Sequence, residues 1–319
     1  MSPEDAAPPR LVCILTESDT LIDARDLRGL VGMAVEAERA GFDGVMASEH
    51  VVLGRGSDAD GRPSNPRDYA LPGNQAPETS WPSSLLLLSA VAAATERIRL
   101  VASAVIAPLR HPLLLAKELA TLDLLSGGRL VVQPTVSWHT AEYEALGVPF
   151  GSRGERLDEH LAALELLWRP GPATFLGRHY RFEDVFLEPK PSRLGGPLLW
   201  FGGERVHDRL LRRLVRHGHG FNPLGRPSDD DLARLRYAMR DAGRDPGELE
   251  IVGGVRGRFP DATSVASLNE ALATIPEQLA RGCTTVCIKP SQFTDDPDEL
   301  PGLLGRIVDR VAAIAADPA

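Results

Sequence analysis

Short apolar runs alternate along the chain with longer segments of helical periodicity. Such runs are typical of buried strands, and an apolar stripe recurring every three or four residues is typical of a helix packed on a sheet. The runs predict strands at residues 11–15, 44–47, 98–106, 129–133, 198–201, 220–221, 249–255 and 285–288. The stripes predict helices at residues 26–40, 82–95, 112–125, 153–168, 205–217, 229–242, 267–281 and 299–315.

Each predicted strand is followed by a predicted helix, so the chain divides into eight βα units. Parallel strands joined by helices need cover on both faces, and eight of them close most readily into a barrel. We therefore predict a single (β/α)8 TIM-barrel domain over residues 1–319, with residues 1–9 flexible. An open doubly wound sheet is the alternative. Residues 16–19 (TESD) argue against it, because they stand where that fold carries a glycine-rich phosphate turn.

Two connections are longer than ordinary loops and predict insertions after strand 2 and after the helix that follows strand 4. Residues 50–81 are rich in Gly and Pro and leave the carboxyl end of a strand, which is the catalytic side of a barrel. This stretch is either a lid or substrate wall, or a plain surface excursion. Residues 169–197 contain a predicted hairpin, 174–182, which turns at Gly177.

Composition narrows the class of protein. The 35 basic and 44 acidic residues give a net charge of -9 without a Lys or Arg run, which argues against a nucleic-acid partner. Cys13, Cys283 and Cys287 are too few and scattered for a disulfide framework, and we expect buried thiols. The apolar run 85–94 is too short to span a bilayer, and the first ten residues do not resemble a signal peptide. We therefore expect a cytoplasmic protein without a membrane partner.

Among side chains at predicted strand ends, His50 has the strongest claim to catalysis. An imidazole there can transfer protons near neutral pH, and Glu49 beside it could raise its basicity. The alternative is a histidine that only hydrogen-bonds a loop. His217 and His219 could form a metal pair, but no carboxylate or cysteine has the spacing of a zinc site, so no metal is expected. Gly202 and Gly203 precede a helix, where backbone N–H groups can approach an anion.

Five segments resemble the bacterial luciferase-like superfamily, especially its actinobacterial deazaflavin-dependent branch. They are AVEAERAGFDGVMASEH (34–50), AAATERIRLVASAVIAPLRHPLLLAKELATLDLLSGGRL (92–130), AEYEALGVPFGSRGERLDEHLAALELLW (141–168), HYRFEDVFLEPKP (179–191) and PLLWFGG (197–203). Their order along the chain makes the resemblance specific.

The resemblance implies a (β/α)8 barrel that binds FMN or the deazaflavin coenzyme F-420 at the carboxyl ends of its strands. It places His50 beside the cofactor ring as a proton-transfer group, with Glu49 among the cofactor contacts. It places Ala104 and Val105 in a bulge of strand 3, where many members carry a cis peptide that is not before proline. Gly202 and Gly203 match the family's glycines near the cofactor phosphate.

One segment departs from the family pattern. Members of this branch usually carry GxGxGW after strand 4, whereas residues 133–138 are QPTVSW, and of that motif only Trp138 remains. Pro134 removes a backbone donor, and the missing glycines restrict close approach of the backbone to a ligand. Either the hydroxyls of Thr135 and Ser137 contact the cofactor, or the cofactor preference has changed.

Three functional hypotheses follow. The first is an oxidoreductase that uses coenzyme F-420 for hydride transfer to or from a small organic substrate. The second is an FMN-dependent monooxygenase that receives reduced flavin from a separate reductase. The third is a barrel without catalysis that binds a cofactor or packs against another subunit. We expect Trp81, with Trp138, to wall the pocket unless it is core packing, and Arg256 and Lys289 to contact an anionic group. The family also implies a homodimer.

Overall fold

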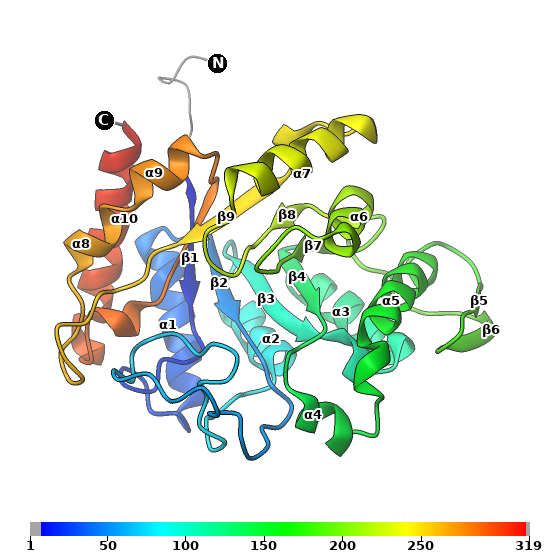
Figure 1. Ribbon diagram of the computed structural model, residues 1–319, viewed down its shortest axis with the longest axis horizontal. Helices are drawn as coiled ribbons and strands as arrows, with labels where there is room; N and C mark the ends of the chain where they lie inside the picture. Colours follow the sequence, from blue (N-terminus) through cyan, green and yellow to red (C-terminus); the bar gives the residue numbers. More distant parts are fainter. Residues whose placement is uncertain (1–7, 317–319) are drawn as a thin grey trace.

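Eight parallel strands close into a barrel in the order β1-β10-β9-β8-β7-β4-β3-β2 (Figure 1). The computed structural model describes residues 8–316, so the flexibility expected for residues 1–9 concerns mainly residues outside the described range. The barrel strands are β1 (Arg10–Ile14), β2 (Gly44–Ala47), β3 (Arg99–Ile106), β4 (Leu130–Thr135), β7 (Leu198–Phe201), β8 (Gly220–Phe221), β9 (Glu250–Gly254) and β10 (Thr285–Ile288). The predicted (β/α)8 barrel is confirmed, and all eight strands lie where the apolar runs indicated.

Helices surround the barrel and bury their apolar faces against it. They are α1 (Leu27–Ala40), α2 (Ser84–Ala94), α3 (Pro112–Leu125), α4 (Thr140–Ala145), α5 (Arg153–Leu167), α6 (Asp208–His217), α7 (Asp229–Asp241), α8 (Leu268–Leu272), α9 (Ile275–Ala280) and α10 (Leu300–Ala316). The single helix predicted at 267–281 is two helices, because Pro276 cannot donate a backbone hydrogen bond inside a helix and begins a new one. The sequence pattern did not predict α4. No helix in the described range has the length and apolar character needed to cross a bilayer.

The inside of the barrel is a small apolar cluster, separate from the core under the helices. Its members are Val12, Ile14, Met46, Val101, Val131, Trp200, Val252 and Cys287, with Tyr69 and Leu198 against them. Side chains two residues apart in a strand share a face, so the positions two further along each strand form the next layer toward the carboxyl ends. That layer contains Ser103, Gln133, Gly202, Asn222 and Lys289. The cysteines are free and buried, as expected.

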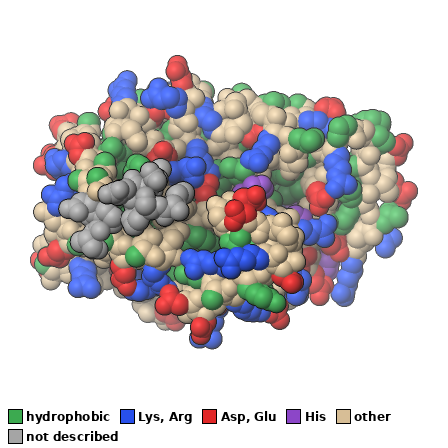
Figure 2. Space-filling model, turned by 90° about the horizontal axis from the view of Figure 1, so that it is seen from above, with side chains coloured by type: hydrophobic (Ala, Val, Ile, Leu, Met, Phe, Trp, Pro, Cys, Tyr) green, Lys and Arg blue, Asp and Glu red, His purple; other side chains and the backbone are tan. Residues whose placement is uncertain are grey.

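Ion pairs close the amino-terminal end of the barrel. Arg99 donates to both carboxylate oxygens of Glu250, at 3.0 and 2.8 Å, and Thr285 donates to one of them at 3.0 Å. The bonds from Arg99 outweigh the desolvation that raises the pKa of Glu250, so this pKa lies below its ordinary value. Figure 2 shows the molecule from the side of the N-terminus, where basic and acidic side chains are interspersed.

The long insertion between β2 and α2 folds back over the carboxyl ends of β1, β9 and β10. The Tyr69 hydroxyl donates to the carbonyl of Val255 at 3.0 Å, and its ring packs on the inner cluster. Asn65 donates to the carbonyls of Asp261 and Ser264 at 2.9 and 2.8 Å. The insertion is therefore a wall over one half of the barrel mouth. The other insertion forms the predicted hairpin, β5 (Ala173–Leu176) and β6 (Arg181–Val185), away from the mouth (Figure 1).

Candidate active site

His50 lies just beyond the carboxyl end of β2, in the row of side chains that points into the barrel. Met46 belongs to the same row and packs in the inner cluster, so alternation directs His50 toward the mouth. The side chain of His50 is 9% exposed, and its Nδ1 donates to Oε2 of Glu142 at 3.4 Å. An ionised carboxylate only accepts, so the proton resides on Nδ1, and Nε2 is the nitrogen that can accept a proton from a ligand.

Glu142, on the short helix α4, is the buried carboxylate of the site. Its side chain is fully buried, and besides His50 it accepts from the backbone N–H of Val51 at 2.6 Å and from Ser137 Oγ at 3.1 Å. Burial raises the pKa of Glu142, but the hydrogen bonds and the charge of protonated His50 outweigh it and hold the pKa below its ordinary value. Glu142 is therefore a charged group that orients His50.

Glu49 points to the opposite side of β2 from His50, because adjacent side chains of a strand alternate between its faces. It accepts from Nη1 and Nη2 of Arg110 at 2.7 and 2.9 Å, from Ser84 Oγ at 2.9 Å and from a backbone N–H of β3 at 3.0 Å. The expectation that Glu49 raises the basicity of His50 is thus corrected, whereas its contact with a cofactor remains a prediction. The carboxylate beside His50 is Glu142, and Glu49 joins β2 to the α2 and β3–α3 segments.

Two tryptophans flank His50. The Trp81 and Trp138 rings lie 5.2 and 5.9 Å from the imidazole, both edge-on. The indole Nε1 of Trp81 is buried and has no hydrogen-bond partner within residues 8–316. His139 lies nearby, but its Nε2 accepts from the backbone N–H of Gly54 at 2.7 Å, which assigns it to holding the insertion. The two indole rings beside His50 fit a planar ligand.

The floor of the mouth is polar. Ser103 in β3, Gln133 in β4 and Asn222 just after β8 form a hydrogen-bonded cluster. The expected bulge of strand 3 is present, because the β3–β4 register shifts between Ser103 and Val105, and the Ser103–Ala104 peptide is cis. Ala104 is partly exposed there, whereas Val105 is buried in the core under the helices.

The hydroxyls expected to replace the missing glycines differ in their surroundings. Thr135 is partly exposed at the end of β4. Ser137 has a φ of 57°, a conformation that side chains rarely adopt, and its Oγ donates to Glu142. The hydroxyl of Ser137 is therefore occupied in positioning Glu142, and the contact of either residue with a cofactor remains a prediction.

Gly202 and Gly203 lie where the chain leaves β7 for α6. A Cβ at Gly202 would come within 2.2 Å of the backbone oxygen of Asn222, so packing of the β7 end against the β8 end already requires a glycine. A Cβ at Gly203 would lie 3.2 Å from a methyl of Leu210. A role of the pair near a phosphate remains a prediction, and Gly202 has a structural reason to be glycine as well.

Lys289 and Arg256 both bind the insertion. Lys289 Nζ donates to the carbonyl of Asp68 at 3.1 Å and lies 3.7 Å from the carboxylate of Glu17, with 1% of its side chain exposed. Burial lowers the pKa of Lys289, which the nearby carboxylates only partly offset. Arg256 donates twice to the carboxylate of Asp68, at 2.8 and 2.7 Å. The structure thus shows both side chains engaged with the protein, and their contact with an anionic ligand remains a prediction.

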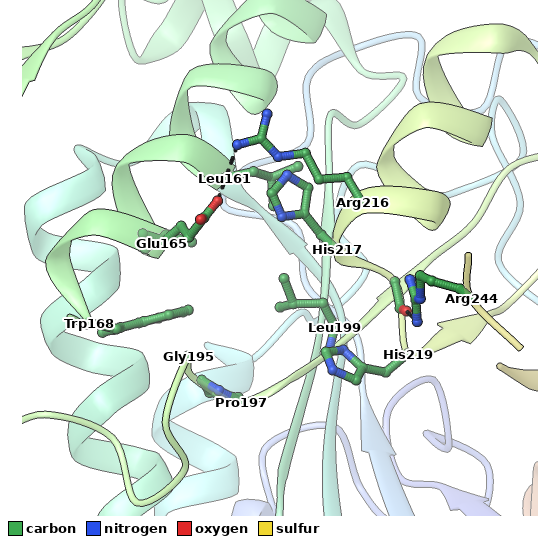
Figure 3. Close-up of a pocket in the computed structure, with 12 residues that line it drawn as sticks. Leu161, Glu165, Trp168, Gly195, Pro197, Leu199, Arg216, His217, His219 and Arg244 are labelled. Atoms are coloured by element: carbon green, nitrogen blue, oxygen red, sulfur yellow. Dashed lines mark hydrogen bonds and ion pairs between the residues drawn. The ribbon is translucent and has the colours of Figure 1, made fainter. Parts of the chain in front are cut away.

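A separate cavity of about 280 Å³ lies at the amino-terminal ends of β7 and β8, between α5 and α6 (Figure 3). His217 and His219, the pair considered for a metal, line it. His219 Nδ1 accepts from the backbone N–H of Leu199 at 3.1 Å, and Arg244 donates to three carbonyls at the end of α6. His219 and Arg244 thus already have partners within the protein, and within residues 8–316 no three His, Cys, Asp or Glu side chains are grouped to hold a metal.

Several residues of the site were not predicted from the sequence. Glu142 is 92 residues from His50, on a helix too short for a periodic signal. Gln133 and Asn222 stood at predicted strand ends, and the period of two in β4 already placed Gln133 in the same row as Val131. This alternation along the strand was the sequence signal that could have identified Gln133 as a residue of the site. It also marks Glu49 as pointing away from the mouth.

Comparison with known proteins gives relatives over most of the barrel. A family model described as luciferase-like monooxygenase matches residues 9–257. An FMNH(2)-dependent dimethylsulfone monooxygenase of Pseudomonas putida is 32% identical over 174 residues, which are 54% of this chain and 42% of that protein. An uncharacterised protein of Mycobacterium bovis is 36% identical over 161 residues, 50% of this chain and 56% of that protein. The chain thus spans about half the length of these relatives.

Solved structures share the fold. An F420-dependent secondary alcohol dehydrogenase, solved in complex with an F420-acetone adduct, superposes with a TM-score of 0.69 over 98% of this chain and 100% of its own. The sequence identity is 14%, so this likeness concerns the fold alone.

Proposed function

Since this chain belongs to the luciferase-like monooxygenase family, we propose that it is an oxidoreductase that holds a flavin-type cofactor at the mouth of its barrel, with His50 as the proton-transfer group. The observation that carries this proposal is the couple of His50 with the buried Glu142, at the carboxyl ends of the strands and between two indole rings. The family resemblance inferred from the five sequence segments is confirmed.

In this proposal Glu142 holds the proton of His50 on Nδ1, and Nε2 takes a proton from the substrate or, once protonated, returns one. The low pKa of Glu142 keeps the carboxylate charged at neutral pH, so the imidazolium formed during turnover has a partner 3.4 Å away. Trp81 and Trp138 restrict the mouth and keep water from the imidazole. A bound flavin-type ring would supply the redox chemistry, as an acceptor or donor of a hydride or as the reduced partner of oxygen.

Two coenzymes are candidates. FMN is favoured by the 32% identity with an FMNH(2)-dependent monooxygenase. Coenzyme F-420 is favoured by the resemblance of the sequence motifs to the deazaflavin-dependent branch. Either ring would contact the Trp81 and Trp138 walls and the floor around Gln133, with its phosphate toward Gly203. A monooxygenase using FMN would need reduced flavin from a separate reductase.

Titration of the protein with each coenzyme, followed by quenching of coenzyme fluorescence, tests the proposal. We expect micromolar binding of one of them, and the coenzyme that binds decides between the two candidates. Consumption of oxygen during turnover then distinguishes a monooxygenase from a dehydrogenase. If neither coenzyme binds at high concentration, the protein is a barrel without this catalysis.

The variant His50→Ala separates binding from chemistry. We expect turnover to fall by about 10²-fold or more, which is the usual contribution of a general acid or base, while coenzyme affinity stays within several-fold. Unchanged turnover removes His50 from the mechanism.

We also propose a homodimer, as the family implies. Leu86 on α2 and Leu114 and Leu125 on α3, two helices that pack together, are 74%, 62% and 62% exposed. Exposed leucines on adjacent helices are typical of an association surface. Light scattering of the wild type and of the double variant Leu86→Glu, Leu114→Glu tests this, with the dimer expected only for the wild type.

A further inference from the structure

The amide of Gln133 occupies the floor of the mouth and is held in one orientation. Its Oε1 accepts two hydrogen bonds, from Ser103 Oγ at 2.8 Å and from Asn222 Nδ2 at 2.8 Å. Asn222 Nδ2 also lies 3.3 Å from Ser103 Oγ, so the three side chains brace one another across β3, β4 and the end of β8. Because two donors occupy the carbonyl oxygen, the amide nitrogen of Gln133 must point the other way.

Within residues 8–316, no hydrogen bond is donated by Gln133 Nε2, and this atom is not among the fully buried polar atoms, so it is open to a ligand or to water. It lies above Gly202, where a Cβ would come within 2.7 Å of it. Gln133 is only 7% exposed, so few waters can serve these donors. A donor that is held in one orientation at a narrow opening is the kind of group that recognises a ligand.

Other candidate ligand donors in the mouth are limited. Ser137 Oγ is used by Glu142, and Lys289 is buried under the insertion. Pro134 has no backbone N–H, so β4 offers one donor fewer there. The Gln133 amide is thus a fixed donor on the floor of the mouth, near the partly exposed Thr135 at the end of β4.

We propose that Gln133 determines cofactor recognition, with its Nε2 donating to a carbonyl oxygen or an unprotonated ring nitrogen of the bound planar ring. The proposal rests on the proposed function, which places that ring in the mouth. Residues 133–138 lack the glycines that would let the backbone approach a cofactor closely. The proposal assigns the contact with the cofactor ring to the Gln133 side chain instead. Ser103 and Asn222 act through Gln133 as positioning residues.

Three variants test the assignment in the full-length protein. Gln133→Glu has the same shape and still accepts from Ser103 and Asn222, but it presents an acceptor where the donor was. Gln133→Met has a similar length and removes the amide without adding charge. Ser103→Ala keeps the donor and removes one of the two groups that orient it.

The readouts are the dissociation constants for FMN and for coenzyme F-420 and the absorption spectrum of the bound coenzyme, which responds to hydrogen bonds at the ring. We expect Gln133→Glu to weaken binding at least about 10-fold, because an acceptor then faces an acceptor, and Gln133→Met by roughly 2- to 12-fold. Ser103→Ala should have a smaller effect than either. A shifted coenzyme spectrum in Gln133→Met would support direct contact.

The binding measurements distinguish failure of the Gln133 assignment from failure of the proposed function. If the wild type binds a coenzyme, while folded Gln133→Glu and Gln133→Met both bind it within twofold and with the same spectrum, the assignment is overturned and the proposed function stands. If the wild type binds neither coenzyme, the proposed function fails and the assignment of Gln133 fails with it. If Gln133→Glu does not fold, Gln133→Met decides by the same twofold criterion.

Discussion

Replacing Glu142 with Gln tests the His50–Glu142 couple with almost no change in shape. The carboxylate accepts from Val51 N–H at 2.6 Å, from Ser137 at 3.1 Å and from His50 at 3.4 Å. In Glu142→Gln, the amide oxygen keeps the short bond to Val51, so the amide NH2 turns toward His50. Two donors cannot face each other, so the imidazole proton moves to Nε2, the nitrogen that has to accept one.

The loss of kcat can be estimated from the hydrogen bond between His50 and the Glu142 carboxylate that the substitution removes. A hydrogen bond to a charged group contributes about 1.5–3 kcal/mol, and each 1.36 kcal/mol is tenfold in rate, so kcat should fall by about 10- to 150-fold. Affinity for the coenzyme should stay within threefold or so, since Glu142 is fully buried behind His50. Ser137→Ala is the matched control, because it removes one neutral donor and leaves the charge.

The assay is kcat and KM as a function of pH, together with the 15N shifts of the His50 ring. The pKa of Glu142 lies below its ordinary value, so protonation of this carboxylate should add its own loss of wild-type activity only at acid pH, below about 4.5. That acid limb should be absent in Glu142→Gln. A variant with kcat within twofold of wild type, and with the proton still on Nδ1, would refute the reasoning.

Two further predictions concern stability. Arg110→Ala should lower the free energy of unfolding by about 3–5 kcal/mol in urea titration, because it leaves the Glu49 carboxylate, 2% exposed, without its charged partner. Arg62→Ala, which breaks an exposed pair, is the control and should cost no more than about 1 kcal/mol. Burial lowers the pKa of His160 to about 4 from 6.5, so between these values the unfolded chain binds a proton that the folded chain does not. Stability should therefore fall as pH drops from 6.5 to 4, by about 3 kcal/mol from this residue, and His160→Gln should show a correspondingly shallower fall; equal pH slopes would contradict the assignment.

The barrel could be predicted because its strands are short, fully buried apolar runs between amphipathic helices. Even β8, with two residues, was identified from its place in the repeat. The segment predicted as one helix at 267–281 is interrupted just before Pro276. The prediction followed the helical periodicity of the apolar residues and gave too little weight to this proline. The short helix α4 has no such signal, because its stability comes from the fold around it, where Glu142 and Tyr143 are buried.

The site was predictable only in part. His50 was identifiable because a strand end is a local feature. The carboxylate that orients it was not, since Glu142 and Glu144 are alike in sequence and only the path of the chain after β4 brings Glu142 to His50. The role first given to Glu49 shows the error of taking sequence neighbours for spatial ones in a strand, where alternation separates them. Lys289 donates to the carbonyl of Asp68 in the insertion, 221 residues away in the sequence, and this contact could not be predicted from the residues around Lys289.

The central claim is that a flavin-type ring binds at the barrel mouth between Trp81, Trp138 and the Gln133 floor. The most direct measurement is an equilibrium titration of FMN and of coenzyme F-420 into the wild type, into Trp138→Ala, and into Arg216→Ala as a control at the cavity on the opposite end of the barrel. We predict micromolar binding of one coenzyme to the wild type and to Arg216→Ala. In Trp138→Ala we predict binding weakened at least about tenfold, because stacking of a planar ring on an aromatic side chain contributes roughly 1–3 kcal/mol. Binding of neither coenzyme, or binding that only Arg216→Ala weakens, would contradict the account.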